Sequence, residues 1–173
     1  DCNKDYRGTD KKEYTGADFD NYTVFSLWDT YRAAHPLYTI LQPERVPDFI
    51  RSMLAIYEQQ GLLPVWHLYG SDTKEMIGIQ SVPVIADAIL KGVPGFDYEK
   101  AFEAMKSSML SNYKGLEYLK EGNYIPADRE KESVAKGLEY AIADWGVAQV
   151  AKKLGKEEDY RWFKARSENY REY

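Results

Sequence analysis

The segment that could do the most chemistry lies at residues 25–36 and reads FSLWDTYRAAHP. Between Trp28 and His35 it carries an indole, a carboxylate, a phenol, a guanidinium and an imidazole. Each polar group of a folded protein must be hydrogen-bonded or solvated, so an ordinary core helix does not need this set. An ionised carboxylate only accepts hydrogen bonds and therefore suits a pair of sugar hydroxyls. The segment indicates a sugar-binding site with Trp28 as the platform and Asp29 as the acceptor.

The same spacing also fits an exposed helix start that binds nothing. Asp29 and Arg32 are three residues apart, and Trp28 and Arg32 are four apart, so each pair can share one helix face. One Asp29–Arg32 salt bridge in water would explain the charges. The spacing alone leaves both interpretations open.

A second polar segment, residues 66–78, reads WHLYGSDTKEMIG. Its density of Trp66, His67 and Tyr69 favours a loop that lines a ligand site, with Asp72 or His67 at the pocket wall. The alternative is a tight loop between two helices. Residues 117–128 read better as a solvated loop, and Asp144, within an apolar stretch, as a structural carboxylate at a helix edge or with a buried partner.

Composition excludes several classes of function. The chain has 173 residues, 44% of them hydrophobic and 29% charged, which fits one globular domain. A net charge of −5 without a basic patch argues against nucleic acid and anionic membranes as partners. No apolar run reaches the roughly 18 residues of a membrane span. A single cysteine, Cys2, excludes an internal disulfide, and two histidines exclude a three-histidine zinc site.

Helical periodicity dominates after residue 22, and residues 1–22 are expected to be mostly loop. We expect helices at 27–41, broken near His35 by Pro36, and at 46–60, 81–91, 97–112 and 133–154, with a last one from 156 onward. Ser81 and Asp97 are the expected N-caps. In the fifth helix, Val134, Leu138, Ala141, Trp145 and Ala148 form an apolar stripe. The fold class is therefore all-α, built of helical hairpins, with the long loops 62–80 and 116–132 on one face.

These residues resemble a known family. The run FSLWDTYR at 25–32, followed by HPL at 35–37, is similar to a motif of glycoside hydrolase family 92, the calcium-dependent exo-α-mannosidases. GSDT at 70–73, MIG at 76–78 and VPVIADA at 82–88 resemble the second block of that family. DYRG at 5–8 and the segment 132–140 resemble flanking blocks. The similarity covers nearly the whole chain, with two smaller departures: Gln80 stands where many members are expected to have histidine or a similar residue, and Gly146 where cysteine is expected.

The resemblance implies a fold and a division of labour. Family members are several times longer, with a β-sandwich followed by an (α/α)6 barrel, so residues 1–173 are expected to be a single internal segment of that barrel. The family acts by inversion and uses a calcium ion that holds the mannose. The blocks expected to carry its catalytic acid and base, Gly-Asn-Glu-Pro and Asn-acidic-Asp-Cys-Gly, do not occur here. We therefore expect no catalytic residue and no metal ligand in this segment, with the calcium ligands elsewhere in the parent.

What remains for this segment is part of the mannose-binding wall. The expected substrate-binding residues are Trp28, Asp29, Arg32, Trp66, His67 and Asp72. The parent is expected to remove terminal α-linked mannose, of the α-1,2 type, from mannosides or N-glycans in the bacterial periplasm or outside the cell, and the isolated segment to be inactive. The alternative is an autonomous helical interaction module with aromatic binding faces. Exposed apolar faces of a barrel segment would also favour a homo-oligomer.

Overall fold

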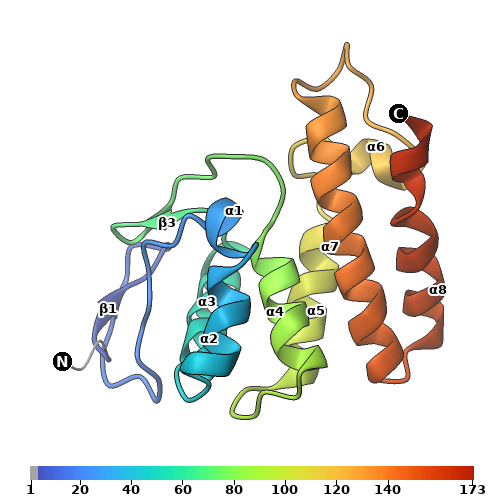
Figure 1. Cartoon of the computed structure of the whole chain (residues 1–173). Coiled ribbons are helices and arrows are strands. Elements are labelled where there is room, and N and C mark those ends of the chain that lie inside the picture. Colours follow the sequence, from blue (N-terminus) through green and yellow to red (C-terminus); the bar gives the residue numbers. More distant parts are fainter. Residues whose placement is uncertain (1–3) are drawn as a thin grey trace.

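The computed structural model describes residues 4–173. Asp1, Cys2 and Asn3 lie outside the described residues, and with them the lone cysteine. In the described part, eight α-helices and two short β-hairpins follow one another along the chain (Figure 1). The prediction of an all-α fold is confirmed.

The N-terminal segment is mostly irregular, as expected. Its regular part is a hairpin in which β1 (Tyr6–Arg7) pairs antiparallel with β2 (Glu13–Tyr14). The rings of Tyr6 and Tyr14 stack with their centroids 5.1 Å apart, which supports this short pairing.

The first expected helix is two helices. α1 (Leu27–Thr30) and α2 (Ala34–Leu41) are separated by a turn at residues 31–33, so the predicted break near His35 was placed too late. Pro36 does not break a helix here because it lies in the first turn of α2, where its missing N–H removes no helical hydrogen bond.

Two other helices match their predictions closely. α3 (Val46–Gln60) has Pro47 in its first turn and ends at Gly61, which has a φ of 75°. α5 (Tyr98–Met109) begins after Asp97, whose side chain accepts hydrogen bonds from the backbone N–H groups of Glu99 and Lys100. Both helices turn a row of apolar side chains into the core.

Two local expectations were wrong. Ser81 does not cap α4 (Ser81–Leu90): the N-cap is Gln80, and neither residue's side chain makes a capping hydrogen bond. The expected loop after residue 115 contains a short helix, α6 (Leu116–Glu121). Its apolar anchors, Leu116 and Leu119, are buried, so tertiary packing stabilises a helix that is too short to be recognised by periodicity.

The longest helix, α7 (Ser133–Lys153), lies against α4, α5 and α8 (Glu157–Arg166), and Gly155 makes the tight turn before α8 (Figure 1). A short 3-10 helix, η1 (Asn169–Glu172), follows α8. Gly146 allows the close approach of α7 to α4, because a Cβ at this position would lie 3.2 Å from the Cβ of Ala86. The C-terminal half of the fold is thus organised around α7.

The apolar stripe expected on α7 is not its core face. Val134, Leu138 and Trp145 are 50%, 44% and 49% exposed, and of the stripe only Ala148 is buried. The core face carries Tyr140, Ala143, Val147 and Ala151 instead. Because α7 is apolar on nearly all sides, periodicity does not tell which face packs inward.

The long loops lie on one side of the molecule, as expected. Figure 1 shows the loop at 62–80 and the loop before α7 on the same side, at the top of the view. The first of them contains the hairpin of β3 (His67–Leu68) and β4 (Ser71–Asp72). Within residues 4–173, no helix combines the length and apolar character that crossing a bilayer requires.

Candidate functional site

Four side chains donate hydrogen bonds to one carboxylate, that of Glu139 on α7. Oε1 accepts from Nε1 of Trp28 at 3.2 Å and from the guanidinium of Arg32 at 3.4 Å. Oε2 accepts from the hydroxyl of Tyr31 at 3.0 Å and from the amide of Gln80 at 2.8 Å. The pKa of Tyr31 is raised by burial and by the negative charge of Glu139. Glu139 therefore joins the run at 28–32 to α4 and α7.

Trp28 and Arg32 also contact each other directly. The guanidinium of Arg32 lies over the indole of Trp28, 4.4 Å from its centroid, and its Nε donates to the Trp28 carbonyl oxygen. The Asp29–Arg32 salt bridge of the alternative interpretation does not form; the anionic partner of Arg32 is Glu139. Arg32 therefore covers one face of the Trp28 ring, and a ligand would have to use the other.

Asp29 is exposed at the surface of the short helix α1. One of its oxygens, Oδ2, accepts a hydrogen bond from the hydroxyl of Ser26. Within residues 4–173, Oδ1 receives no side-chain hydrogen bond, so it is open to a ligand hydroxyl. An exposed carboxylate held beside an ordered indole and guanidinium is suited to bind a polyhydroxylated ligand.

The structure brings the two predicted polar segments together. Ser26 and Trp66 form an antiparallel β-bridge, and the N–H of Val24 donates to the carbonyl oxygen of His67 at 2.9 Å. Trp66 is half-buried at this junction. The hairpin at 67–72 therefore lies directly beside the start of α1.

Asp72 organises the backbone of its own hairpin. Its carboxylate accepts from the backbone N–H groups of Trp66 at 3.0 Å, Val65 at 3.2 Å and Lys74 at 3.1 Å, and from the side chain of Gln60 at 3.0 Å. These bonds fix the loop that presents Trp66. Asp72 thus has a local structural role that the sequence did not indicate.

His67 lies inward, at the edge of a small cavity lined by aromatic and aliphatic side chains that include Phe25 and Phe49. Neither of its ring nitrogens has a hydrogen-bond partner in the described part of the chain. Burial lowers the pKa of His67, and the nearby charge of Asp72 opposes that shift. The imidazole is therefore neutral at physiological pH.

Glu139 and Gln80 complete the site, and the sequence did not single them out as site residues. No local signal was available for Glu139: it lies four and eight residues before Ala143 and Val147, but only the structure shows that these residues form the core face of α7, where an acidic side chain needs partners. Gln80 is fully buried, and its Oε1 has no hydrogen-bond partner within residues 4–173.

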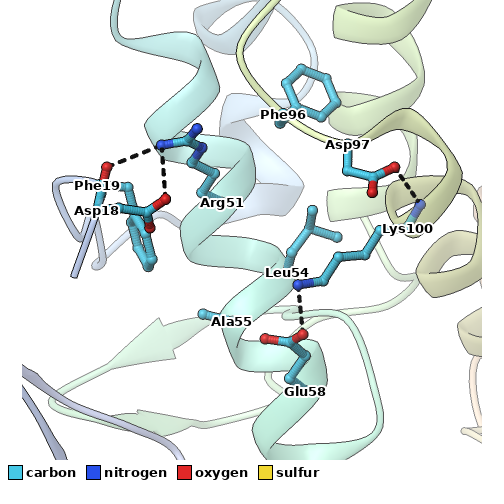
Figure 2. A pocket seen from close by; sticks show the side chains of 9 residues that line it. All are labelled: Asp18, Phe19, Arg51, Leu54, Ala55, Glu58, Phe96, Asp97 and Lys100. Carbon is cyan, nitrogen blue, oxygen red and sulfur yellow. Dashed lines mark hydrogen bonds and ion pairs between the residues drawn. The ribbon is translucent and has the colours of Figure 1, made fainter.

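A separate hollow of about 320 Å³ lies between the N-terminal loop, α3 and α5 (Figure 2). Its charged groups are already paired: Arg51 contacts both the carbonyl oxygen and the carboxylate of Asp18, and Lys100 contacts Glu58. These pairs tie the N-terminal loop and α5 to α3. The hollow contains none of the predicted site residues.

The residues described do not offer a calcium site. Within residues 4–173, no three His, Cys, Asp or Glu side chains lie close enough together to hold a metal ion. Of the described acidic side chains near the site, Glu139 already accepts from four donors, which leaves Oδ1 of Asp29 as the one carboxylate oxygen open to a ligand.

The expected structural role of Asp144 is clear in the structure. Asp144 on α7 is buried and accepts from Nε of Arg166 on α8 at 2.7 Å, in a two-point ion pair. Arg166 also donates to the carbonyl oxygen of Met109 at 2.9 Å. This pair fastens α8 to α7 and α5, away from the site at Glu139.

The outer face of α7 forms one wall of an apolar surface groove. Together with α8 and η1 it forms a groove of about 450 Å³ whose walls include Leu138, Ile142, Trp145 and Tyr170. The three α7 side chains are roughly half exposed. An apolar groove of this kind on a helix that is apolar on nearly all sides is typical of a covered surface.

Comparisons with known proteins agree on one family. Residues 1–173 match the glycosyl hydrolase family 92 catalytic domain. The structure superposes on the family GH92 alpha-mannosidase BT3965 from Bacteroides thetaiotaomicron with a TM-score of 0.95 and 50% identity over 99% of this chain. A structure of BT3965 in complex with mannoimidazole gives the same TM-score and identity. The family GH92 inverting mannosidase BT2199 from the same species gives 0.89 and 35% over 96% of this chain.

The chain spans 24% of BT3965 and 23% of BT2199. A search of curated proteins gives no match.

Proposed function

The chain belongs to glycosyl hydrolase family 92, as a segment of its catalytic domain, and we propose that its parent protein is an exo-α-mannosidase. In that parent, this segment forms part of the mannose-binding wall. Asp29 accepts hydrogen bonds from two sugar hydroxyls, and the free face of Trp28 contacts the ring. Arg32 and Trp66 border the same surface, and His67 and Asp72 shape its floor and its loop.

The observation that carries the proposal is the exposed carboxylate of Asp29 beside an indole that is fixed by Glu139. If Asp29 and Arg32 formed only a surface salt bridge, nothing would require the buried carboxylate of Glu139 and its four donors. Burying that carboxylate costs free energy unless each of its acceptor positions is paired. The mannose-like ligand of BT3965, a relative with 50% identity, gives the sugar class.

The remaining chemistry is proposed for other parts of the parent. The reaction is inverting and releases terminal mannose from an α-1,2 linkage, with calcium bound outside residues 4–173. An inverting hydrolysis needs an acid and a base on opposite sides of the sugar. Neither expected block occurs in this sequence, so we assign no catalytic residue to it. The parent acts in the periplasm or outside the cell.

The test is the D29N variant of the full-length parent, assayed with an aryl α-mannoside. Hydrogen bonds to a charged group are worth about 1.5–3 kcal/mol, so kcat/KM is expected to fall about 10- to 100-fold. The matched control is D128N, which changes an exposed carboxylate in the loop before α7. Equal kcat/KM values for D29N and the wild type would refute the assignment of Asp29.

The isolated chain should hydrolyse no α-mannoside, with or without calcium, because the acid and base lie outside it. Calcium-dependent turnover by the 173 residues alone would overturn the division of labour proposed above.

A second role, as an interaction surface, is favoured by the apolar groove on α7. We propose that the rest of the catalytic domain covers this groove in the parent. The chain spans about a quarter of the length of its relative BT3965. When the chain is on its own, a second copy takes that place.

A further inference from the structure

Glu139 has no hydrogen-bonding capacity left for a ligand. A carboxylate offers about four lone-pair positions on its two oxygens. All four are used: Oε1 accepts from Trp28 and Arg32, and Oε2 accepts from Tyr31 and Gln80. The residue is also 9% exposed, so little of it reaches the surface. A sugar hydroxyl could bind Glu139 only by displacing one of these donors.

Three of the four donors come from one turn of chain. Trp28, Tyr31 and Arg32 lie at spacings of three and four, so they share the side of α1 and the following turn that faces α7. α1 itself is only one turn long and has no capping side chain. An isolated helix of this length is unstable in water, so its geometry depends on contacts to the rest of the fold.

Glu139 supplies contacts that fix the orientation of two rigid groups. The Trp28 indole has a single donor, and the bond from its Nε1 to Oε1 sets the ring's rotation. Arg32, held by the same Oε1, stacks on the Trp28 ring at 4.4 Å. Asp29 lies between these residues in sequence and is exposed. Its place is therefore determined by the residues on either side of it.

We propose that Glu139 is a positioning residue for mannoside binding: it holds Trp28 and Arg32 so that Asp29 and the free face of the indole meet the sugar, and it does not touch the sugar itself. The inference rests on the function proposed above for Asp29. Gln80 supports the same arrangement from α4, because its amide donates to both Glu139 and the carbonyl oxygen of Ile77. The fixed geometry lowers the ordering cost of binding the ligand.

The experiment compares E139Q with the wild type in the full-length parent. Glutamine has the size of glutamate but brings a donor to a place where four donors converge, so it breaks the arrangement without leaving a cavity. We expect KM for an aryl α-mannoside and the Kd for mannoimidazole to rise about tenfold, with kcat changed less than about twofold.

The matched control is Y140F on the adjacent residue of α7. Tyr140 is fully buried, and its hydroxyl donates to the carbonyl oxygens of Tyr113 and Lys114, away from Trp28. Y140F should lower the melting temperature and leave KM and Kd unchanged. If both variants shift Kd in proportion to their loss of stability, Glu139 is only structural and the proposal fails.

A milder variant covers the case in which E139Q does not fold. Y31F removes one donor to Oε2 and keeps the ring, and it should raise KM about threefold. An unchanged KM for Y31F would then overturn the proposal.

The D29N variant distinguishes the mannose-binding role proposed for Asp29 from the positioning role proposed for Glu139. Unchanged KM and kcat/KM in D29N refute the mannose-binding wall itself, whereas altered values in D29N together with normal E139Q and Y31F refute only the role of Glu139.

Discussion

Trp28 on α1 and Glu139 on α7 are 111 residues apart in sequence, and the indole N–H of one donates to the carboxylate of the other at 3.2 Å. This bond links the N-terminal polar segment to the central helix of the C-terminal half. The partners of Glu139 surround it closely enough that Trp28 and Glu139 should act as one energetic unit.

The W28F variant of the 173-residue chain is expected to lower the free energy of unfolding by about 1.5 kcal/mol, the lower end of the range for a hydrogen bond to a charged group, because three donors to Glu139 remain. Urea unfolding followed by circular dichroism measures this change. W145F, at a half-exposed Trp on α7, should have little effect. The W28F/E139Q double variant should cost less than the sum of the single variants, by about 0.5–2 kcal/mol; simple additivity would show that the two residues are not coupled.

The buried ion pair between Asp144 and Arg166 gives a second prediction. R166M leaves a buried carboxylate without its partner and is expected to cost about 3–5 kcal/mol at pH 7. Burial raises the pKa of Asp144 to about 6, and Arg166 opposes that rise. Removing Arg166 raises the pKa further, so the penalty of R166M should shrink as the pH falls from 7 to 5 and the carboxylate takes up a proton.

Chemical denaturation of R166M at pH 7 and pH 5 tests this directly. The D144L/R166M double variant serves as the control, since it removes both charges and should be more stable than R166M alone. A double variant as unstable as the sum of its parts would mean that the two side chains contribute mainly by packing.

The lowered pKa of the buried His35 side chain leads to a prediction of how stability depends on pH. Burial lowers its pKa from 6.5 to about 4, with the backbone of Thr30 opposing the shift, and its ring contacts Phe25, Tyr38 and Phe49 edge to face. The unfolded chain then binds a proton more readily than the folded chain between these two values. Stability should therefore be complete above pH 6.5 and fall by up to about 3 kcal/mol as the pH approaches 4. His67 acts in the same direction.

The free energy of unfolding, measured by urea titration between pH 7 and pH 4, checks the sign. Carboxylates also titrate near the lower end, so the informative quantity is the difference between the wild type and H35L. That difference should narrow or reverse in favour of H35L as the pH falls. A constant difference would show that His35 takes up its proton equally well in the folded and unfolded states.

Local signals in the sequence were enough for most of the helices. Pro47, Gly61 and Asp97 are residues whose backbone preferences define helix ends, and the structure has those ends where they were expected. Pro36 misled because a proline in a first turn and a proline at a break look alike in sequence. The outer face of α7 misled because a helix with apolar residues on several sides has no single inward stripe.

Only the part of the candidate site whose residues are close in sequence could be predicted. Trp28, Asp29 and Arg32 are close in sequence, so their types and spacing carried information. Glu139 reaches Trp28 only through the tertiary position of α7, and Gln80 reaches the site only through its bond to Glu139; no local rule connects residues 111 or 59 positions apart. The pairing of Arg32 with Glu139 rather than with Asp29 follows from the tertiary position of α7 as well.

The apolar groove on α7 leads to a prediction about self-association. Leu138, Ile142 and Trp145 expose apolar surface in one continuous row, and burying it against a second copy would be favourable. The weight-average mass of the 173-residue chain, measured by sedimentation, should rise with concentration in the micromolar range. I142K should keep the chain monomeric without loss of stability, because the side chain is 46% exposed. The matched control is L37K on α2, because Leu37 is 48% exposed and lies outside the groove. The L37K variant should associate like the wild type. Equal association of I142K and the wild type would place the contact elsewhere on the surface.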